Sequence, residues 1–182
     1  MTTAPTPALT TWKIDPVHSS VEFAVRHLMI TTVKGRFTGV SGSVQTDDDD
    51  VAKGEAEITI DAATIDTREP QRDAHLKSPD FFDVEKFPTI AFKSTRIIEA
   101  SDGSFKLAGN LSMHGVTREV VLDVASEGRT KDPWGGDRAG YSATTRLKRS
   151  DFGLTWNQAL ESGGFMVGDE IKITLDVELI KQ

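Results

Sequence analysis

The sequence contains no cysteine among its 182 residues, which excludes disulfides, thiolate zinc sites, iron–sulfur clusters and cysteine nucleophiles. It also lacks a run of ~18 consecutive apolar residues, so it offers no segment for a transmembrane helix. Cations are the scarcer charges, because 21 Lys and Arg oppose 28 Asp and Glu, and the net charge of −7 repels phosphate backbones. We therefore expect no transmembrane segment and no nucleic-acid partner.

The N-terminal stretch, MTTAPTPALTTW, has neither the basic leader nor the apolar run of a secretory signal. We expect residues 1–11 to form a flexible N-terminal arm. Residues 12–182 are expected to form a single domain, because a hydrophobic content of 37% is enough for one core. The expected location is the cytoplasm, or the periplasm or the cell exterior if a leader has been removed.

Recognised catalytic and metal-binding motifs are missing too. The sequence has no HExxH, HxH, GxSxG, GxGxxG or GxxxxGKS pattern. Two metal ligands on one strand need an even spacing, whereas His18 and His27 are nine positions apart. Ser19 and Ser20 are expected to satisfy backbone groups, and the run Asp47–Asp50 is expected to be a solvated turn. We predict no catalytic residue, no metal and no cofactor other than a bound ligand.

What the sequence does contain is repeated alternation of apolar and polar residues, which is typical of β-strands with one wet face. Gly39 and Gly42 lie where the apolar parity changes after Phe37, and they predict a bulge or a bend. Eight one-sided strands favour an all-β antiparallel barrel, with a two-sheet sandwich as the main alternative. The predicted strands are the opening segment from Trp12, Val33–Thr46, Ala56–Ala62, Thr89–Glu99, Phe105–Met113, Val120–Val124, Gly140–Lys148 and Ile171–Leu179.

Two connections are much longer than the usual ~4–6 residues. The first long loop runs from about Asp66 to Pro88, and the second long loop from about Arg149 to Gly168. Pro70 predicts the start of one short helix and Ser78-Pro79 the start of another. Residues 157–162 predict a turn or two of helix in the second long loop. Because both loops are rich in large apolar side chains, we expect them to cover an open end of the barrel as lids, or to act as plain plugs of its core.

Arg149 and Asp151 are two positions apart and could share a face. They predict either a fixed ion pair that holds the second long loop or a surface pair of little energetic value.

Six sequence blocks carry a resemblance to a known family. In order, they are WKIDPVHSSVEFAVRHL, GRFTGVSG, DAHLKSPDFFDVEKFPTIAFKS, GNLSMHGVTREV, RSDFGL and VGDEIKITLDVEL. From about Trp12 to Leu179 the chain resembles the YceI-like proteins, which are lipocalin-like barrels that bind polyisoprenoid lipids. The resemblance implies an extended eight-stranded antiparallel barrel with short helical insertions in the two long loops, and a long apolar tunnel. It also implies dimers, a periplasmic setting for some relatives, and no catalytic residues to transfer.

The predicted function is binding of a polyisoprenoid or quinone-like lipid for transport, storage or sequestration, without enzymatic activity. One alternative is an enzyme acting on such a lipid with His27 or His114 as general base, and another is a non-lipid interaction module with a filled barrel. His27 falls on the apolar parity of its strand and is expected to meet a ligand head group or a tunnel water. The predicted ligand-binding side chains are Val21, Phe23, Val25, His27, Phe37, Ile58, Ile60, Phe81, Phe82, Phe92, Leu111, Met113, Leu122, Tyr141, Phe152, Trp156 and Phe165.

Overall fold

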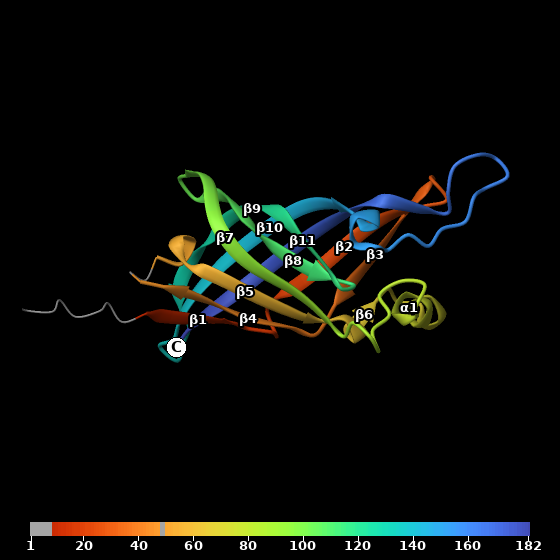
Figure 1. The fold of residues 1–182 in the computed structure, drawn as a ribbon. Coiled ribbons are helices and arrows are strands. Elements are labelled where there is room, and N and C mark those ends of the chain that lie inside the picture. The colour runs from red at the N-terminus through yellow and green to blue at the C-terminus, as the bar shows by residue number, and fades with distance from the viewer. Residues whose placement is uncertain (1–8, 48–49) are drawn as a thin grey trace, which may run out of the picture.

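A computed structural model describes residues 9–47 and 50–182, in which one antiparallel sheet closes on itself as an elongated barrel (Figure 1). Hydrogen-bonded neighbours follow the order β1-β4-β5-β7-β8-β9-β10-β11, and β1 also pairs with β11, which completes a ring of eight strands. The predicted barrel is therefore confirmed, and the sandwich alternative is wrong. The strands are β1 (Thr10–Ile14), β2 (Ser20–His27), β3 (Thr31–Phe37), β4 (Val40–Thr46), β5 (Glu55–Asp61), β6 (Ile65–Asp66), β7 (Thr89–Ser101), β8 (Ser104–Met113), β9 (Val116–Lys131), β10 (Asp137–Lys148) and β11 (Val167–Lys181).

Two of the predicted strands are each divided in the middle. β1 and β2 both pair with β11, β1 at its C-terminal end and β2 nearer its N-terminal end. β3 and β4 are separated by Thr38 and Gly39, where the apolar parity changes and the predicted bend is found. β1 begins at Thr10, whereas the N-terminal arm expected before it falls largely on residues 1–8, outside the described residues. The predicted turn Asp47–Asp50 likewise lies partly outside them.

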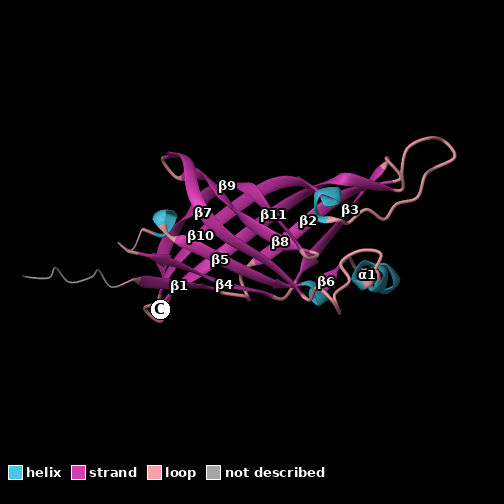
Figure 2. Cartoon of the chain, viewed as in Figure 1, coloured by secondary structure: helices cyan, strands magenta, loops and turns pink. Residues whose placement is uncertain are grey.

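The first long loop contains one α-helix, α1 (Pro70–Lys77), which lies beyond one end of the barrel (Figure 2). Pro70 occupies its first turn as predicted, and the Glu69 carboxylate accepts hydrogen bonds from two of its free amides. The second helix predicted at Ser78-Pro79 is wrong, because turns follow α1. The Ser78 hydroxyl donates to the His75 carbonyl at 2.6 Å and so ends α1 instead of starting another helix.

The second long loop opens with a short 3-10 helix, η3 (Arg149–Phe152), and then runs without helix. The helix predicted for residues 157–162 is wrong, because Ala159 forms a bridge with Phe165. The Asn157 side chain explains the extended backbone, since it accepts from the Val167 amide at 3.0 Å and donates to the Val167 carbonyl at 2.7 Å. Two further 3-10 helices are η1 (Val51–Lys53) and η2 (Ala62–Thr64). In the described chain, no helix is long and apolar enough to cross a membrane.

Candidate functional site

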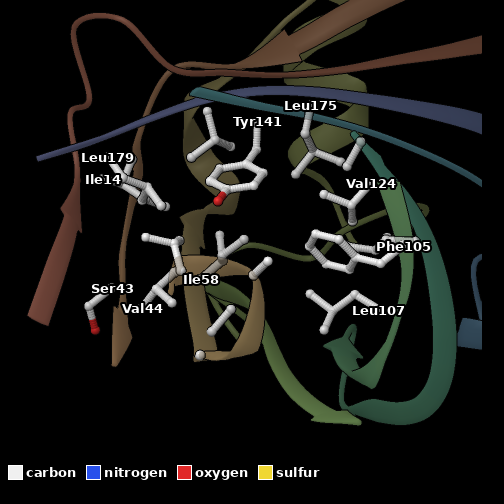
Figure 3. A pocket seen from close by; sticks show the side chains of 17 residues that line it. Ile14, Ser43, Val44, Ile58, Phe105, Leu107, Val124, Tyr141, Leu175 and Leu179 are labelled. Carbon is white, nitrogen blue, oxygen red and sulfur yellow. The ribbon is translucent and has the colours of Figure 1, made fainter. Parts of the chain in front are cut away.

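The interior of the barrel contains an apolar cavity of about 80 Å³ (Figure 3). It lies in the half of the barrel that holds β1, the start of β8 and the end of β11, which we call the cavity half. Hydroxyl groups in the lining come from Ser43 and Tyr141, and the other lining side chains are apolar. The cavity is lined by Ile14, Ser43, Val44, Val51, Ala52, Gly54, Ala56, Ile58, Phe105, Leu107, Leu122, Val124, Tyr141, Ala143, Leu175, Val177 and Leu179.

The cavity exists because several of its lining residues are small. Ala52, Ala56 and Ala143 occupy lining positions at which a larger side chain would fill the space. A ligand pocket usually has ~300–1,000 Å³, so this cavity is smaller than a lipid chain requires. A bound chain must therefore displace side chains or open the cavity toward a neighbouring space.

The other half of the barrel is packed with aromatic rings, and we call it the aromatic half. The Phe37 ring lies 5.7 Å from Phe23 and 5.8 Å from Phe82, measured between ring centroids. Phe23 lies against Gly35, where an added Cβ would overlap the ring. Phe92 lies over Gly109 in the same way, and Phe152 is almost completely buried. These rings fill the cross-section that stays partly open in the cavity half.

The two long loops meet each other over the aromatic half. Trp156 of the second long loop lies 5.2 Å from the Phe81 ring and 4.8 Å from the His75 ring, both in the first long loop. His75 Nε2 in turn lies 2.8 Å from the Asp80 carboxylate, which orients the imidazole. The two loops therefore pack against each other, and their role as lids or as plugs of the core stays a prediction.

Arg149 holds the second long loop against the barrel. Its guanidinium is buried and donates to the carbonyls of Leu154 at 2.7 Å, Trp156 at 2.9 Å and Gly168 at 2.8 Å. The loop is thus fixed at both of its ends by one cation. Burial lowers the pKa of Arg149, and the nearby Asp169 partly opposes this effect.

The ion pair predicted between Arg149 and Asp151 is wrong. Asp151 is exposed, and its backbone carbonyl accepts a hydrogen bond from Arg118 at 2.9 Å. The predicted role of Arg149 in holding the loop is nevertheless found, with backbone carbonyls as its partners. Carbonyl partners give no sequence signal, which explains why the pattern pointed to a carboxylate.

A second arginine, Arg138, binds three carboxylates on the outside of the cavity half. Its guanidinium lies 2.9 Å from Asp15, 2.9 Å from Asp132 and 2.5 Å from Glu178. His18 Nδ1 completes the cluster at 2.8 Å from Asp15. The hydrogen bond from His18 is the largest cause that lowers the pKa of Asp15 to about 2, and Asp15 raises the pKa of His18 in return. Sequence reasoning missed this cluster because its members come from four separate segments.

Asp15, His18 and Glu178 place metal-binding atoms within 4.8 Å of one another. The Arg138 guanidinium already lies against both carboxylates, and it supplies the positive charge that a metal ion would bring. Ser19 serves the backbone as predicted, because its hydroxyl accepts from the Glu178 amide at 3.0 Å and lies 3.4 Å from the carbonyl of the same residue. The cluster therefore ties β1, β2, β10 and β11 together.

His27 lies at the end of β2, paired with Thr31 and Val167. Its Nε2 is buried and has no hydrogen-bond partner among the described residues, an unusual state for a polar atom. His114 differs, because its Nδ1 lies 3.1 Å from the Phe152 carbonyl and its ring packs 5.0 Å from Phe87. His114 thus has a packing role beside the aromatic half.

The predicted ligand-binding residues are spread over both halves of the barrel. Ile58, Leu122 and Tyr141 line the cavity. Val25 and Phe165 border a hollow of about 730 Å³ on the outside, beside β2 and the second long loop. Phe81 and Trp156 contact each other where the two loops meet. His27 lies at the end of β2. The remaining predicted residues belong to the packed core: Val21, Phe23, Phe37, Ile60, Phe82, Phe92, Leu111, Met113 and Phe152.

The predicted inward position of Phe165 is wrong, because its side chain is 58% exposed. The bridge to Ala159 holds it in the loop beyond the barrel end. Conversely, sequence reasoning missed cavity residues such as Phe105 and Val177. Both lie on predicted strands, at positions that alternate with polar residues, so the same alternation could have identified them.

A closed antiparallel barrel, an apolar interior and two loops covering one end define a lipocalin-like barrel protein. More specifically, the chain belongs to the YceI-like domain family, whose family model matches residues 12–179. A UPF0312 protein of Vibrio cholerae is 37% identical over 137 residues, which cover 75% of this chain and 72% of that protein. A UPF0312 protein of Staphylococcus aureus is 36% identical over 171 residues, which cover 93% of this chain and 97% of that protein.

Solved structures share the fold. Campylobacter jejuni YCEI protein superposes with a TM-score of 0.72 at 30% identity, over 86% of this chain and 90% of that one. Burkholderia cenocepacia BcnA superposes with a TM-score of 0.78 at 22% identity, over 91% and 98%. A polyisoprenoid binding domain from Saccharophagus degradans superposes with a TM-score of 0.71 at 13% identity, over 94% and 98%.

Proposed function

We propose that this protein binds a polyisoprenoid or quinone-like lipid inside the barrel and holds it for transport, storage or sequestration. The observation that carries the proposal is the apolar cavity enclosed by the ring of eight strands. Membership of the YceI-like family supports it, as does the shared fold of the polyisoprenoid binding domain from Saccharophagus degradans. Homodimer formation and the cellular compartment stay predictions. Light scattering of the purified protein tests whether a homodimer forms.

The physical basis of such binding is burial of the ligand's hydrocarbon surface. Each buried methylene contributes about 0.8 kcal/mol, so a few five-carbon units supply useful affinity even after the cost of association. No reactive group is needed for this role. Displacement of side chains around the small cavity reduces the net gain, so we expect the ligand to be long enough to offset that cost.

An enzymatic role for the same interior has weaker support. A general base needs a partner that orients it, and the buried His27 Nε2 has none among the described residues. We therefore propose that His27 is a polar neighbour of bound lipid or of an interior water. His27→Gln tests the difference, because a general base would lose turnover completely while lipid uptake stayed intact.

The proposal is tested by organic extraction of freshly purified protein, followed by mass spectrometry of the extract. Stripped protein is then offered a polyprenol, and bound lipid is measured after gel filtration. Ala143→Leu, which fills the cavity, should reduce uptake strongly, whereas Ala125→Leu on the outer face should not. Recovery of no lipid together with no uptake by the stripped protein contradicts the proposal.

A further inference from the structure

The cavity adjoins an outside hollow at two residues that line both spaces. This second hollow has a volume of about 430 Å³ and lies between η1 and the β9–β10 pair. Val51 and Tyr141 line both the cavity and the hollow. The remaining wall of the hollow comes from Asp50, Ser126, Gly128, Arg129 and Ala139. We call the Val51–Tyr141 pair the partition.

The barrel wall is irregular at the partition. The register of β9 against β10 shifts between Gly140 and Tyr141, so that Glu127 is left out of the ladder. Gly128 beside it has φ +119°, a conformation that side chains rarely adopt. On the other side of the hollow, η1 contains no buried residue. A segment with so little burial can shift at low cost in free energy, and that shift would join the two spaces.

Joining the spaces resolves a mismatch in size and polarity. The cavity is apolar but too small for a lipid chain, whereas the hollow is large but open to solvent. Together they reach the ~300–1,000 Å³ of ordinary ligand pockets. One end of the joined space is apolar and the other is polar, and this asymmetry fits an amphiphile.

The polar atom at the junction is the Tyr141 hydroxyl. In Figure 3 it points toward the middle of the cavity, while the Ser43 hydroxyl points away. Burial is the main cause that raises the pKa of Tyr141, and no hydrogen bond to a described residue contributes. Asp50 raises this pKa and Arg129 lowers it, so charges of both signs lie near the hydroxyl. The effect of Asp50 is the larger of the two, so the charges near the hydroxyl give an anionic head group no advantage over a neutral one.

Resting on the proposed function, we propose that the ligand is an apolar chain with a neutral, hydrogen-bond-accepting oxygen such as a carbonyl. It enters through the partition, its chain lies in the cavity, and the Tyr141 hydroxyl donates a hydrogen bond to its oxygen. Val51 and Tyr141 thus form the gate, and Tyr141 is the residue that selects the head group. His27, in the aromatic half, is then a neighbour of the chain and not of the head.

Three probes of similar length test the head-group assignment: farnesylacetone, a saturated C18 isoprenoid hydrocarbon, and farnesyl pyrophosphate. Wild-type protein should bind the ketone more tightly than the hydrocarbon or the pyrophosphate. Tyr141→Phe should weaken ketone binding by about three- to tenfold, the effect of one hydrogen bond, and leave hydrocarbon binding unchanged. Ser142→Ala is the matched control, because it removes a hydroxyl that lies outside the cavity lining on the same strand and binds Glu127, and it should leave the preference for the ketone intact.

The outcomes separate the two proposals. If the ketone and the hydrocarbon bind, and Tyr141→Phe changes neither affinity or changes both equally, the head-group assignment is overturned while the proposed function stands. If no probe binds to wild-type protein, the proposed function fails, and this inference fails with it. Tyr141 is the only tyrosine in the chain, so 3-fluorotyrosine gives one ¹⁹F resonance, which should shift with the ketone and not with the hydrocarbon.

The route is tested by uptake rates. Val51→Trp enlarges the partition and should slow uptake of farnesylacetone by more than about tenfold, a large kinetic effect of a blocked gate. Phe165→Trp, at the opposite end of the barrel, should leave the rate unchanged. The route is wrong if the Val51 variant takes up the ketone at the wild-type rate, or if the Phe165 variant is the slow one.

Discussion

The cavity half and the aromatic half share long strands such as β8, whose start lines the cavity and whose Gly109 lies against Phe92, yet only one half contains the cavity. In the aromatic half, the rings of Phe23 and Phe92 spread over Gly35 and Gly109 and fill the barrel. In the cavity half, alanine occupies several lining positions, and the large side chains of Phe105 and Tyr141 border the remaining space without filling it. The difference shows that side-chain volume at inward positions, rather than strand geometry, decides where a small barrel can hold a ligand.

The two halves are also fastened differently. Arg138 fastens the cavity half through three carboxylates, whereas Arg149 fastens the end with the long loops through backbone carbonyls. Carboxylates can be protonated and carbonyls cannot. The cavity half should therefore respond to acid and the loop end should not.

The largest expected effect comes from truncating a ring in each half. Phe152→Ala should lower the free energy of unfolding by about 3–5 kcal/mol, because Phe152 is 1% exposed and its loss leaves a new cavity. Phe105→Ala should cost only about 1–2 kcal/mol, because this ring already borders unfilled space and is partly exposed. Denaturant unfolding of both variants measures the difference. Equal losses would mean that the two halves are packed alike.

Much of the fold could be predicted from the sequence, because alternation over eight segments reports directly which side of each strand is wet. The bend at Gly39 was visible for the same reason, since a change of parity requires a bulge or a bend in the strand. The helices predicted at Ser78 and at residues 157–162 failed, because capping residues were assigned without knowing their partners. Ser78 caps the preceding helix, and Asn157 pairs with Val167 ten residues later.

The candidate site was less predictable than the fold. Parity identified inward residues such as Ile58 and Tyr141, but it could not distinguish a residue beside a void from one in packed core. That distinction depends on the combined volume of side chains from neighbouring strands, such as Ala143 on β10 and Phe105 on β8. Arg138 and its three carboxylates were invisible because ion pairs between distant segments leave no local pattern.

The next effect concerns the two arginines. Arg149→Met should destabilise the protein by about 2–3 kcal/mol, since several buried carbonyls lose their donor. This loss should be the same at pH 4 and pH 8, and limited proteolysis should cut the second long loop. Arg138→Met is the matched variant, and its cost should shrink only below pH 4, where Asp15 and Asp132, whose pKa values are lowered, become protonated, so both variants are also measured down to pH 2. If the loss of stability depended on pH in the same way in both variants, the two halves would not differ in how their arginines are bound.

A smaller effect of opposite sign is expected from filling the cavity. Ala143→Val adds two methyl groups toward unfilled space and should stabilise the protein by about 0.5–1.5 kcal/mol. Ala108→Val is the matched variant at a position with 0% exposure outside the cavity lining, and it should destabilise by about 1–3 kcal/mol through overpacking. Thermal unfolding measures both. Destabilisation by both variants would mean that the cavity half has no usable space.

The smallest expected effect is the pH dependence of the Asp15–His18 pair. The pKa of Asp15 is lowered from 3.8 to about 2 in the folded protein. Its contribution to stability is therefore present above pH 4 and is lost as the pH falls through about 2. The pKa of His18 is raised from 6.5, so its contribution is complete below pH 6.5 and is lost as the pH rises through the folded value.

His18→Gln isolates the basic side of this profile. Wild-type protein should lose some thermal stability between pH 6 and pH 9, and the variant should lose less, because glutamine does not titrate. The change should be small, since the His18 side chain is 59% exposed and solvent screens its charge. His75→Gln is the matched control in the first long loop, where the imidazole also lies 2.8 Å from a carboxylate. If the His75 variant flattens the profile and the His18 variant does not, the pH response between pH 6 and pH 9 belongs to the lids and not to the cavity half.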